Sequence, residues 1–490
     1  MKKAFLIIML LAPIFVFAQT ESDMLDYSTI YYQGTAKSAA MGNAMGAVGN
    51  DFSAIAINPA SLGMFRKSSF IYTLGFNTIY SKSVYQNNND FDINLKLKNN
   101  NIGLTWTQDI NDGGLSSVSF ALGINRLNDY SLNSFVNGDN ANTSLVDAYF
   151  NEMANNNIGN SYDLEDYSYD ILYPLYQTYI IDTIYSVGDY ATWVPQGGLN
   201  QRRSVVKRGD AKEFTFSTGF NFNEKFFFGV SVNVPYFDKK THSTYTETNL
   251  TSEYFKNWSQ EEIVASSGAG INAKFGVIVF PAKWIRLGAS FHSPTLYKVT
   301  DSWYTKTYSS MGNFNGYYET EVATSRYNVT TPYRFNASTA FIFGNFGMIT
   351  ADYEYVDYTF MRASGYDYTN LNNFIKDTYK STSNFRIGTE WRWQTFAFRA
   401  GYAFYGSPYG IDNSNLRTNS YSCGFGYTYN RFTLDMAYVL SRRENAYDLY
   451  SQYSFYPAYY GDNNEFVDDT KVKETTNIHQ MVISFKFRLD

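Results

Sequence analysis

Apolar and polar residues alternate one by one along most of this sequence, which is the period of a β-strand. Residues 214–222 (FTFSTGFNF) place four phenylalanines on one face and small or polar residues on the other. The run 228–234 repeats the pattern after a tight turn, and the run 396–404 shows it again. The chain is therefore expected to form strands that each have one apolar and one polar face.

The spacing of these runs predicts how many strands there are. Six tight turns separate pairs of runs, at 111–114, 223–225, 281–283, 344–345, 392–394 and 429–431. Longer polar segments alternate with them, at 85–99, 127–211, 246–262, 304–316, 362–380, 406–416 and 447–472. Together they join fourteen strands, and short turns at one end with long loops at the other are typical of a transmembrane barrel.

The predicted fold class is therefore all-β, a 14-stranded antiparallel transmembrane β-barrel. Closure follows from hydrogen bonding, because an open sheet edge in lipid leaves its amides and carbonyls unpaired. A soluble sandwich or propeller shares the alternation, but it has shorter strands and less unequal loops. Aromatic residues make up 19% of the chain and charged residues 17%, a balance that favours strands and membrane boundaries.

Composition also excludes several classes of function. The net charge is −6 and no basic cluster is present, so nucleic acid is not an expected partner. The single cysteine, Cys423, permits no internal disulfide. The three histidines lack metal-ligand spacing, and no nucleophile elbow, phosphate loop or carboxylate pair stands out. We expect no enzymatic activity, no metal and no cofactor.

The first residues have the pattern of a secretory signal peptide. Two lysines precede an apolar run, 4–17, and small residues precede Gln19. The apolar run is too short for a spanning helix, which needs ~20 residues. The predicted organisation is a cleaved signal peptide at 1–18, an N-terminal hatch at 19–67 and a barrel at 68–490 with a long extracellular loop at 127–211.

The hatch is predicted from a stretch that is almost free of bulky side chains. Gly42 and Gly46 form a GxxxG, but neighbouring asparagines interrupt the apolar context that a membrane dimer needs. A compact insert inside a crowded lumen suits this composition better. Asn58 precedes a proline and can cap a short helix that Pro59 and Ala60 begin, either as a plain turn or as a rigid corner of the hatch.

Four stretches, residues 34–63, 285–303, 331–361 and 384–410, resemble the FadL/TodX family of outer-membrane transporters for long-chain fatty acids and other hydrophobic compounds. The resemblance includes the Asn-Pro-Ala corner of the hatch, and residues 127–211 depart from it most. It implies a monomer in the outer membrane of a Gram-negative bacterium, surrounded by outer-membrane lipid and inserted by the barrel-assembly machinery. Its partners are then hydrophobic small molecules.

The resemblance also implies a route. A hydrophobic molecule is captured at an extracellular groove, moves to a pocket in the barrel and leaves sideways through a gap in the wall. In the family a kink in the third strand makes that gap, and Gly123 is the residue here best able to permit a kink. Alternatively, Gly123 leaves room for the hatch.

Two further sets of candidate residues have two interpretations each. Within the long loop, a mixed apolar pattern either packs on itself as a cap or also offers the substrate groove, through Leu172, Leu175, Tyr176, Tyr179 and Ile180. Four inward-facing arginines either anchor the hatch by ion pairs or meet a substrate carboxylate: Arg286, Arg334, Arg386 and Arg399.

Three other functions stay open. A general porin is the first, although porins need no glycine-rich hatch. A barrel scaffold that serves protein secretion or surface binding is the second. The third is an outer-membrane enzyme, although no catalytic constellation is apparent. Within the transport function, aromatic hydrocarbons or haem can replace fatty acids, because the sequence does not identify the hydrophobic compound.

Overall fold

The computed structural model describes residues 21–156, 158, 160–183, 190–250, 252–365, 367–410, 417–450 and 470–489. The predicted signal peptide, 1–18, lies outside the described residues. No helix among the described residues is long and apolar enough to cross a bilayer.

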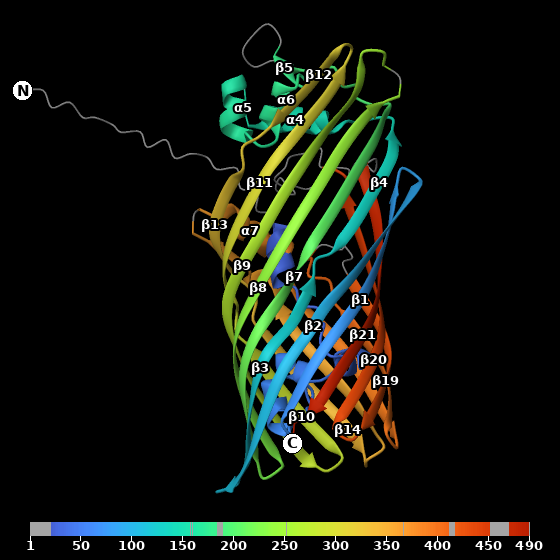
Figure 1. Cartoon of the computed structure of the whole chain (residues 1–490). Helices are drawn as coiled ribbons and strands as arrows, with labels where there is room; N and C mark the ends of the chain where they lie inside the picture. Colours follow the sequence, from blue (N-terminus) through green and yellow to red (C-terminus); the bar gives the residue numbers. More distant parts are fainter. Residues whose placement is uncertain are drawn as a thin grey trace, which may run out of the picture.

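The predicted fold class is confirmed: fourteen antiparallel strands form a closed barrel (Figure 1). Nine strands are continuous: β1 (Ser69–Tyr85), β2 (Asn88–Asp112), β7 (Leu199–Phe222), β8 (Phe226–Asn249), β9 (Phe255–Ala282), β17 (Ser381–Trp393), β18 (Phe396–Tyr405), β19 (Arg417–Tyr429) and β20 (Phe432–Asp448). The last strand, β21 (Lys471–Arg488), pairs with β1 and closes the cylinder.

The other four strands are interrupted. They consist of β3 (Leu115–Asp129) with β4 (Leu132–Asn140), β10 (Ile285–His292) with β11 (Leu296–Met311), β12 (Phe314–Glu319) with β13 (Ala323–Thr330) and β14 (Arg334–Phe343), and β15 (Gly347–Asp357) with β16 (Arg362–Ser364). At the second interruption, Pro294 lacks the N–H that a ladder needs. Thr295 and Thr331 bridge the neighbouring breaks, because each backbone N–H bonds the other residue, at 3.0 Å.

All six predicted tight turns connect strands at the same end of the barrel. The opposite end differs from the prediction, because strands continue through much of 85–99, 246–262 and 304–316. Gln86 and Asn87, with φ of 46° and 64°, form the two-residue turn between β1 and β2. The long loop also begins later and ends earlier than predicted, since β4 and the upper half of β7 lie within 127–211.

The outer surface explains why these ends were missed. Near the short turns, outward side chains are apolar and exposed, such as Phe216 (52%), Val232 (49%) and Phe385 (51%). Further along the same strands they are polar, as at Asp238, Lys240 and His242. Since β9 has 28 residues and ~9–11 suffice to cross a bilayer, the polar halves project beyond the apolar belt and lose the alternating pattern.

The N-terminal helices lie inside the barrel, where the strands enclose them (blue in Figure 1). They are α1 (Glu21–Ser28), α2 (Ala36–Ala40), α3 (Phe52–Ile57) and the short 3-10 helix η1 (Pro59–Met64). We call residues 36–64 the inner segment. Across the far end, α4 (Leu145–Asn155), α5 (Ser161–Ser168), α6 (Leu172–Gln177) and the β5–β6 pair (Asp182–Thr183, Tyr190–Ala191) form a cap. Between β15 and β17 lie η2 (Tyr358–Phe360) and α7 (Thr369–Thr378).

Candidate functional site: the lumen, its inner segment and the wall

Glycines on both sides let the inner segment touch the barrel wall. A Cβ on Gly288 of β10 would lie 2.6 Å from the carbonyl oxygen of Gly46. Gly42 has a φ of +60°, and a Cβ there would lie 2.8 Å from the carbonyl oxygen of Tyr402 in β18. Larger side chains would separate the two backbones, so the predicted small-residue stretch has a packing role.

The Asn-Pro-Ala sequence forms a cap at the start of η1. Asn58 has an extended backbone, and its side chain accepts a hydrogen bond from the backbone N–H of Ala60 at 3.1 Å. The amide nitrogen of the same side chain donates to the carbonyl oxygens of Gly46, at 2.8 Å, and of Val277 in β9, at 3.2 Å. Pro59 occupies the first helical turn, where no N–H is needed. Asn58 thus joins two parts of the inner segment to the wall.

A second buried network, which sequence reasoning missed, joins the residue just before the inner segment to the start of α3. The hydroxyl of Thr35 donates to both carboxylate oxygens of Asp51, at 2.9 and 2.8 Å. Asp51 also accepts from the backbone N–H of Ser53 at 2.9 Å and caps α3. The sequence does not predict this pairing, because threonine and aspartate are both common in loops and only the folded structure brings these two together.

Each of the four predicted arginines has a partner within the protein. Arg286 donates to the carbonyl oxygen of Val48 in the inner segment at 2.9 Å. Arg334 donates to the carbonyl oxygen of Ser28 and pairs with Glu354 at 3.2 Å. Arg386 lies 3.5 Å from the other oxygen of Glu354, and Arg399 pairs with Glu390 and Asp435, both at 2.6 Å. Arg286 thus bonds the inner segment and Arg334 bonds the end of α1, whereas the ion pairs of Arg334, Arg386 and Arg399 join strands of the wall to one another.

Helix α1 lies in an apolar chamber between the inner segment and the cap. Its side chains Met24, Leu25 and Tyr27 are buried, and the ring of Tyr27 stacks on Phe237 of β8 at 4.3 Å. The wall of the chamber is largely aromatic, and its residues come from α7 and from strands that are distant in the sequence. They are Tyr130, Phe237, Tyr297, Tyr327, Tyr358, Tyr368 and Ile375. Thus α1 occupies apolar volume that a hydrophobic ligand of the barrel would need.

A charged clamp holds α1 to the wall. The ammonium of Lys239 in β8 lies 2.7 Å from Asp23 and 2.5 Å from Asp26, and Lys207 lies 3.8 Å from Asp26. Burial raises the pKa of Asp26, but attraction to Lys239 and Lys207 outweighs it and lowers the pKa to about 2, from an ordinary value of 3.8. Because the folded-state pKa is depressed, the clamp contributes fully above about pH 4 and is lost as the pH falls toward 2.

Replacing Lys239 tests the clamp. Lys239→Met removes a 5%-exposed cation and leaves two carboxylates without it, which we expect to weaken α1 docking by about 2–3 kcal/mol. Hydrogen exchange of the α1 amides should then be on the order of 100-fold faster at pH 7. Lys240→Met, the outward neighbour, is the matched control and should leave the exchange unchanged. Equal protection of α1 in both variants would contradict the clamp.

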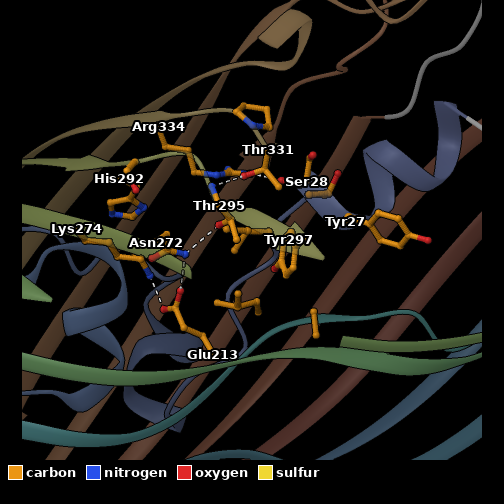
Figure 2. Close-up of a pocket in the computed structure, with 16 residues that line it drawn as sticks. Tyr27, Ser28, Glu213, Asn272, Lys274, His292, Thr295, Tyr297, Thr331 and Arg334 are labelled. Carbon is orange, nitrogen blue, oxygen red and sulfur yellow. Dashed lines mark hydrogen bonds and ion pairs between the residues drawn. The ribbon is translucent and has the colours of Figure 1, made fainter. Parts of the chain in front are cut away.

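Two lumen cavities adjoin α1 and the inner segment. Figure 2 shows the first, of about 20 Å³, where Lys274 and Asn272 point to Glu213. Lys274 lies 2.5 Å from Glu213, and Nε2 of His292 is 2.8 Å from the carbonyl oxygen of Ile57. The second, of about 70 Å³, borders Tyr31 and the barrel strands on the other side. Since a cavity that holds benzene measures about 150 Å³, a hydrophobic ligand needs α1 or the inner segment to move.

No group of three or more histidine, cysteine, aspartate or glutamate side chains among the described residues is arranged to hold a metal ion.

Three of the five residues predicted to line a substrate groove are instead buried inside the cap. Leu172, Leu175 and Ile180 are buried in the cap core, so they cannot line an open groove here. Tyr176 is half-buried, whereas Tyr179 is 53% exposed. Tyr179 packs edge to face with Phe314 of β12 at 5.1 Å. Nearby, Trp193 and Tyr254 lie 4.8 Å apart, and Tyr308 and Tyr317 lie 4.9 Å apart. We call these six exposed aromatic residues the aromatic rim.

A buried carboxylate fixes the cap to the barrel. Glu247, at the end of β8, accepts five hydrogen bonds of 2.7–3.0 Å, from Ser144, Leu145, Gln201, Tyr245 and Trp258. Because Ser144 and Leu145 begin α4, the cap and three strands share one acceptor.

Glu247→Ala should release the cap. It leaves five buried donors without their acceptor, at an expected cost of about 3 kcal/mol or more. We expect limited proteolysis to cleave within 141–198 in this variant while the barrel stays resistant. Glu224→Ala, at an exposed turn, removes a carboxylate far from the cap and should behave like the wild type. A cap that stays resistant after Glu247→Ala would show that it is held by apolar packing alone.

Gly123 does not open the wall. It pairs with Gly103 of β2 on one side and Thr215 of β7 on the other without interruption. A Cβ at this position would lie 2.5 Å from Cζ of Phe52 in α3. Gly123 therefore leaves room for the inner segment, which was the alternative interpretation.

The wall is interrupted higher up, between β2 and the β3–β4 strand. Within the described residues, β2 pairs with β3 only from Asn101 onward, so 88–99 pair with β1 alone and Asn100 lies at a bulge in that pairing. β4 pairs instead with β7. The outward row of this β2 edge is strongly exposed, up to 71% at Leu95 and 63% at Leu97. We call this interruption the seam.

Polar side chains hold the seam closed in place of backbone pairs. Asn133 of β4 donates to Asp92 of β2 at 3.1 Å and accepts from Asn94 at 3.4 Å. Lys98 of β2 lies 3.5 Å from Asp210 of β7. Side-chain contacts of this kind are weaker than a continuous ladder, so this section of the wall should open more readily than a fully paired section.

A closed fourteen-stranded barrel that contains its own N-terminal helices is the fold of the FadL-like outer-membrane transporters. A FadL homologue from Pseudomonas aeruginosa is 12% identical, with a TM-score of 0.54 over 94% of this chain and 99% of that chain. The toluene transporters TodX of Pseudomonas putida and TbuX of Ralstonia pickettii give TM-scores of 0.51 and 0.50 at 12% and 14% identity, over 94% of this chain and 99% of theirs.

These neighbours are transporters, not enzymes, and at this level of identity the likeness establishes the fold. No protein-family model matches the chain, and no curated protein matches it.

Proposed function

We propose that this protein is an outer-membrane channel that takes up hydrophobic molecules, long-chain fatty acids or similar compounds, through a plugged barrel with a lateral exit. The observation that carries the proposal is the seam. The lumen is filled by the inner segment and α1, yet the wall lacks backbone pairing between 88–100 of β2 and the β3–β4 strand. A water-filled pore needs the opposite arrangement, an open lumen and a continuous wall.

The route begins at the aromatic rim, where exposed rings offer apolar surface to a molecule arriving from outside. It continues into the chamber that α1 fills, where the ligand displaces Met24, Leu25 and Tyr27 and takes over their apolar contacts. The Lys239 clamp sets the cost of that displacement. The inner segment, anchored by Asn58 and Arg286, keeps water and ions from following.

Exit through the seam delivers the ligand directly to lipid. Each buried methylene gains about 0.8 kcal/mol by staying out of water, so an acyl chain that leaves sideways avoids a large penalty. The exposed row from Phe91 to Leu97 provides the apolar surface along which it emerges. No energy source is required, because the movement is passive diffusion down a gradient.

Mass spectrometry of lipids that co-purify with the protein tests the proposal. Recovered fatty acids would support the proposal. Recovered aromatic hydrocarbons would support a channel for hydrophobic molecules and identify aromatic compounds as its substrate. A bound polypeptide would instead support a scaffold in protein secretion, and haem would indicate a different cargo. If loading with oleate or toluene also leaves neither compound bound, the proposed function is wrong.

A further inference from the structure

The outer face of the barrel changes abruptly from apolar to basic above the belt on one side. Phe214 lies opposite Val234, and Ile271 lies opposite Leu296; all four face outward and are 40–58% exposed. These residues mark the upper border of the apolar belt on β7, β8, β9 and β11. On each of these strands, the next outward-facing side chain lies two residues beyond the border residue, on the side away from the belt.

Above this border five outward-facing cations gather: Arg208, Lys212, Lys240, Lys298 and Arg326. We call them the basic patch. The register of β7 and β8 has no shift, so Lys240 shares the outward face of Val234. Two carboxylates lie on the same face, Asp210 and Asp238. Asp210 is already shared by Lys98, Arg126 and Lys212, at 2.9–3.5 Å.

The patch has unmet charge. In the described part of the chain, the ion pairs include none of Arg208, Lys240, Lys298 and Arg326. Arg208 has neutral acceptors only, the nearest being the side-chain oxygen of Asn133 in β4 at 2.6 Å. Arg208 and Lys240 lie directly opposite each other on β7 and β8. Like charges opposed across a sheet destabilise it, so an anion outside the barrel that bridges them would relieve this repulsion.

The strand between the flanking cations provides space for a head group. On β9 the outward residues at this height are Ala265, Ser267 and Ala269, all small and exposed. Lys240 borders this trough on β8 opposite Ala265, and Lys298 borders it on β11 opposite Ala269. The two backbones are therefore about 10 Å apart across the strands and about 13 Å apart along them. Long flexible side chains on both sides can then reach a group that rests on the small residues.

We propose that the basic patch binds the phosphate groups of a phosphorylated glycolipid in the outer leaflet. A carboxylate ligand in transit would need cations that face the lumen, whereas these face outward, immediately above the lipid-facing row. Lysine and arginine donate strong charge-assisted hydrogen bonds to phosphate, and each cation near a membrane surface adds to the attraction for anionic lipid. The inference rests on the proposed membrane location, not on the transported compound.

Native mass spectrometry of the detergent-solubilised full chain tests the patch. The probe is bis-phosphorylated lipid A, compared with its dephosphorylated form. Lys240→Ser, Lys298→Ser and Arg326→Ser together should weaken binding of the phosphorylated form roughly 100-fold. The matched control removes three exposed cations near the short turns: Lys67→Ser, Lys225→Ser and Lys283→Ser.

The outcomes separate the two proposals. Selective loss in the patch variant supports the site. Equal affinity for both lipid forms, or equal loss in the patch and control variants, overturns it while leaving transport untouched. A chain that stays folded and monodisperse in water without detergent would instead refute the membrane location on which the site depends. Heat-modifiable migration of each variant confirms that the barrel is folded before binding is compared.

Discussion

Deletion of residues 36–64 is expected to turn the barrel into an ion-conducting pore. The fourteen strands close through their own backbone pairs, so the wall does not depend on the inner segment for its hydrogen bonds. Removing the inner segment empties the part of the lumen that it fills. We expect single-channel conductance in planar bilayers to rise on the order of 10-fold or more above that of the wild type.

A milder variant covers the case in which the deletion fails to insert. Gly288→Leu forces a side chain against Gly46 and should lift the inner segment from the wall without removing it. Ala289→Leu, the exposed outward neighbour on the same strand, adds similar bulk away from the lumen and is the matched control. If an inserted deletion variant conducts no better than the wild type, the inner segment does not block the lumen.

Cross-linking the seam is expected to stop uptake. Cysteines at Asn94 and Asn133, whose side chains hydrogen-bond across the seam, can be joined by a short bis-maleimide in a Cys423→Ser background. A covalent bridge prevents β2 and β4 from separating. Uptake of a labelled fatty acid should fall at least ~10-fold, because no other exit keeps the chain out of water.

The control pair crosses two strands that are already hydrogen-bonded. Arg442 of β20 lies opposite Asn477 of β21, so a cross-link there joins strands that do not need to part. It should leave uptake within error of the uncross-linked protein. Unchanged uptake in both cross-linked proteins would place the exit elsewhere, and loss in both would indicate that general stiffening is responsible.

The sequence predicts the lower half of the molecule better than the upper half. Near the short turns, lipid outside and water or protein inside impose strict alternation, so FTFSTGFNF can be assigned to a strand by inspection. Residues that favour tight turns, such as those at 223–225, mark the ends of these strands. Above the belt both faces of β7 are polar, and residues such as Arg202 carry no periodic pattern that separates strand from loop.

The site itself depends on contacts that no local pattern encodes. Lys239 and Asp26 are 213 residues apart, and only the barrel register brings them together. The seam coincides with a register shift between Arg126 and Asn128 and with the departure of β4 toward β7, beside Gly209, whose φ is 121°. Gly123 was the obvious candidate by residue type, but its neighbour Phe52 explains it.

The most direct test of the plugged barrel compares its uptake of a fatty acid with its leakage of a small sugar. Outer-membrane vesicles that contain the wild-type protein are given a labelled long-chain fatty acid together with a small labelled sugar. We predict saturable uptake of the fatty acid above that of vesicles without the protein, with no added permeability to the sugar. Entry of the sugar at a matching rate, or no uptake of the fatty acid or of toluene supplied in its place, would contradict a plugged barrel that releases its cargo through the wall.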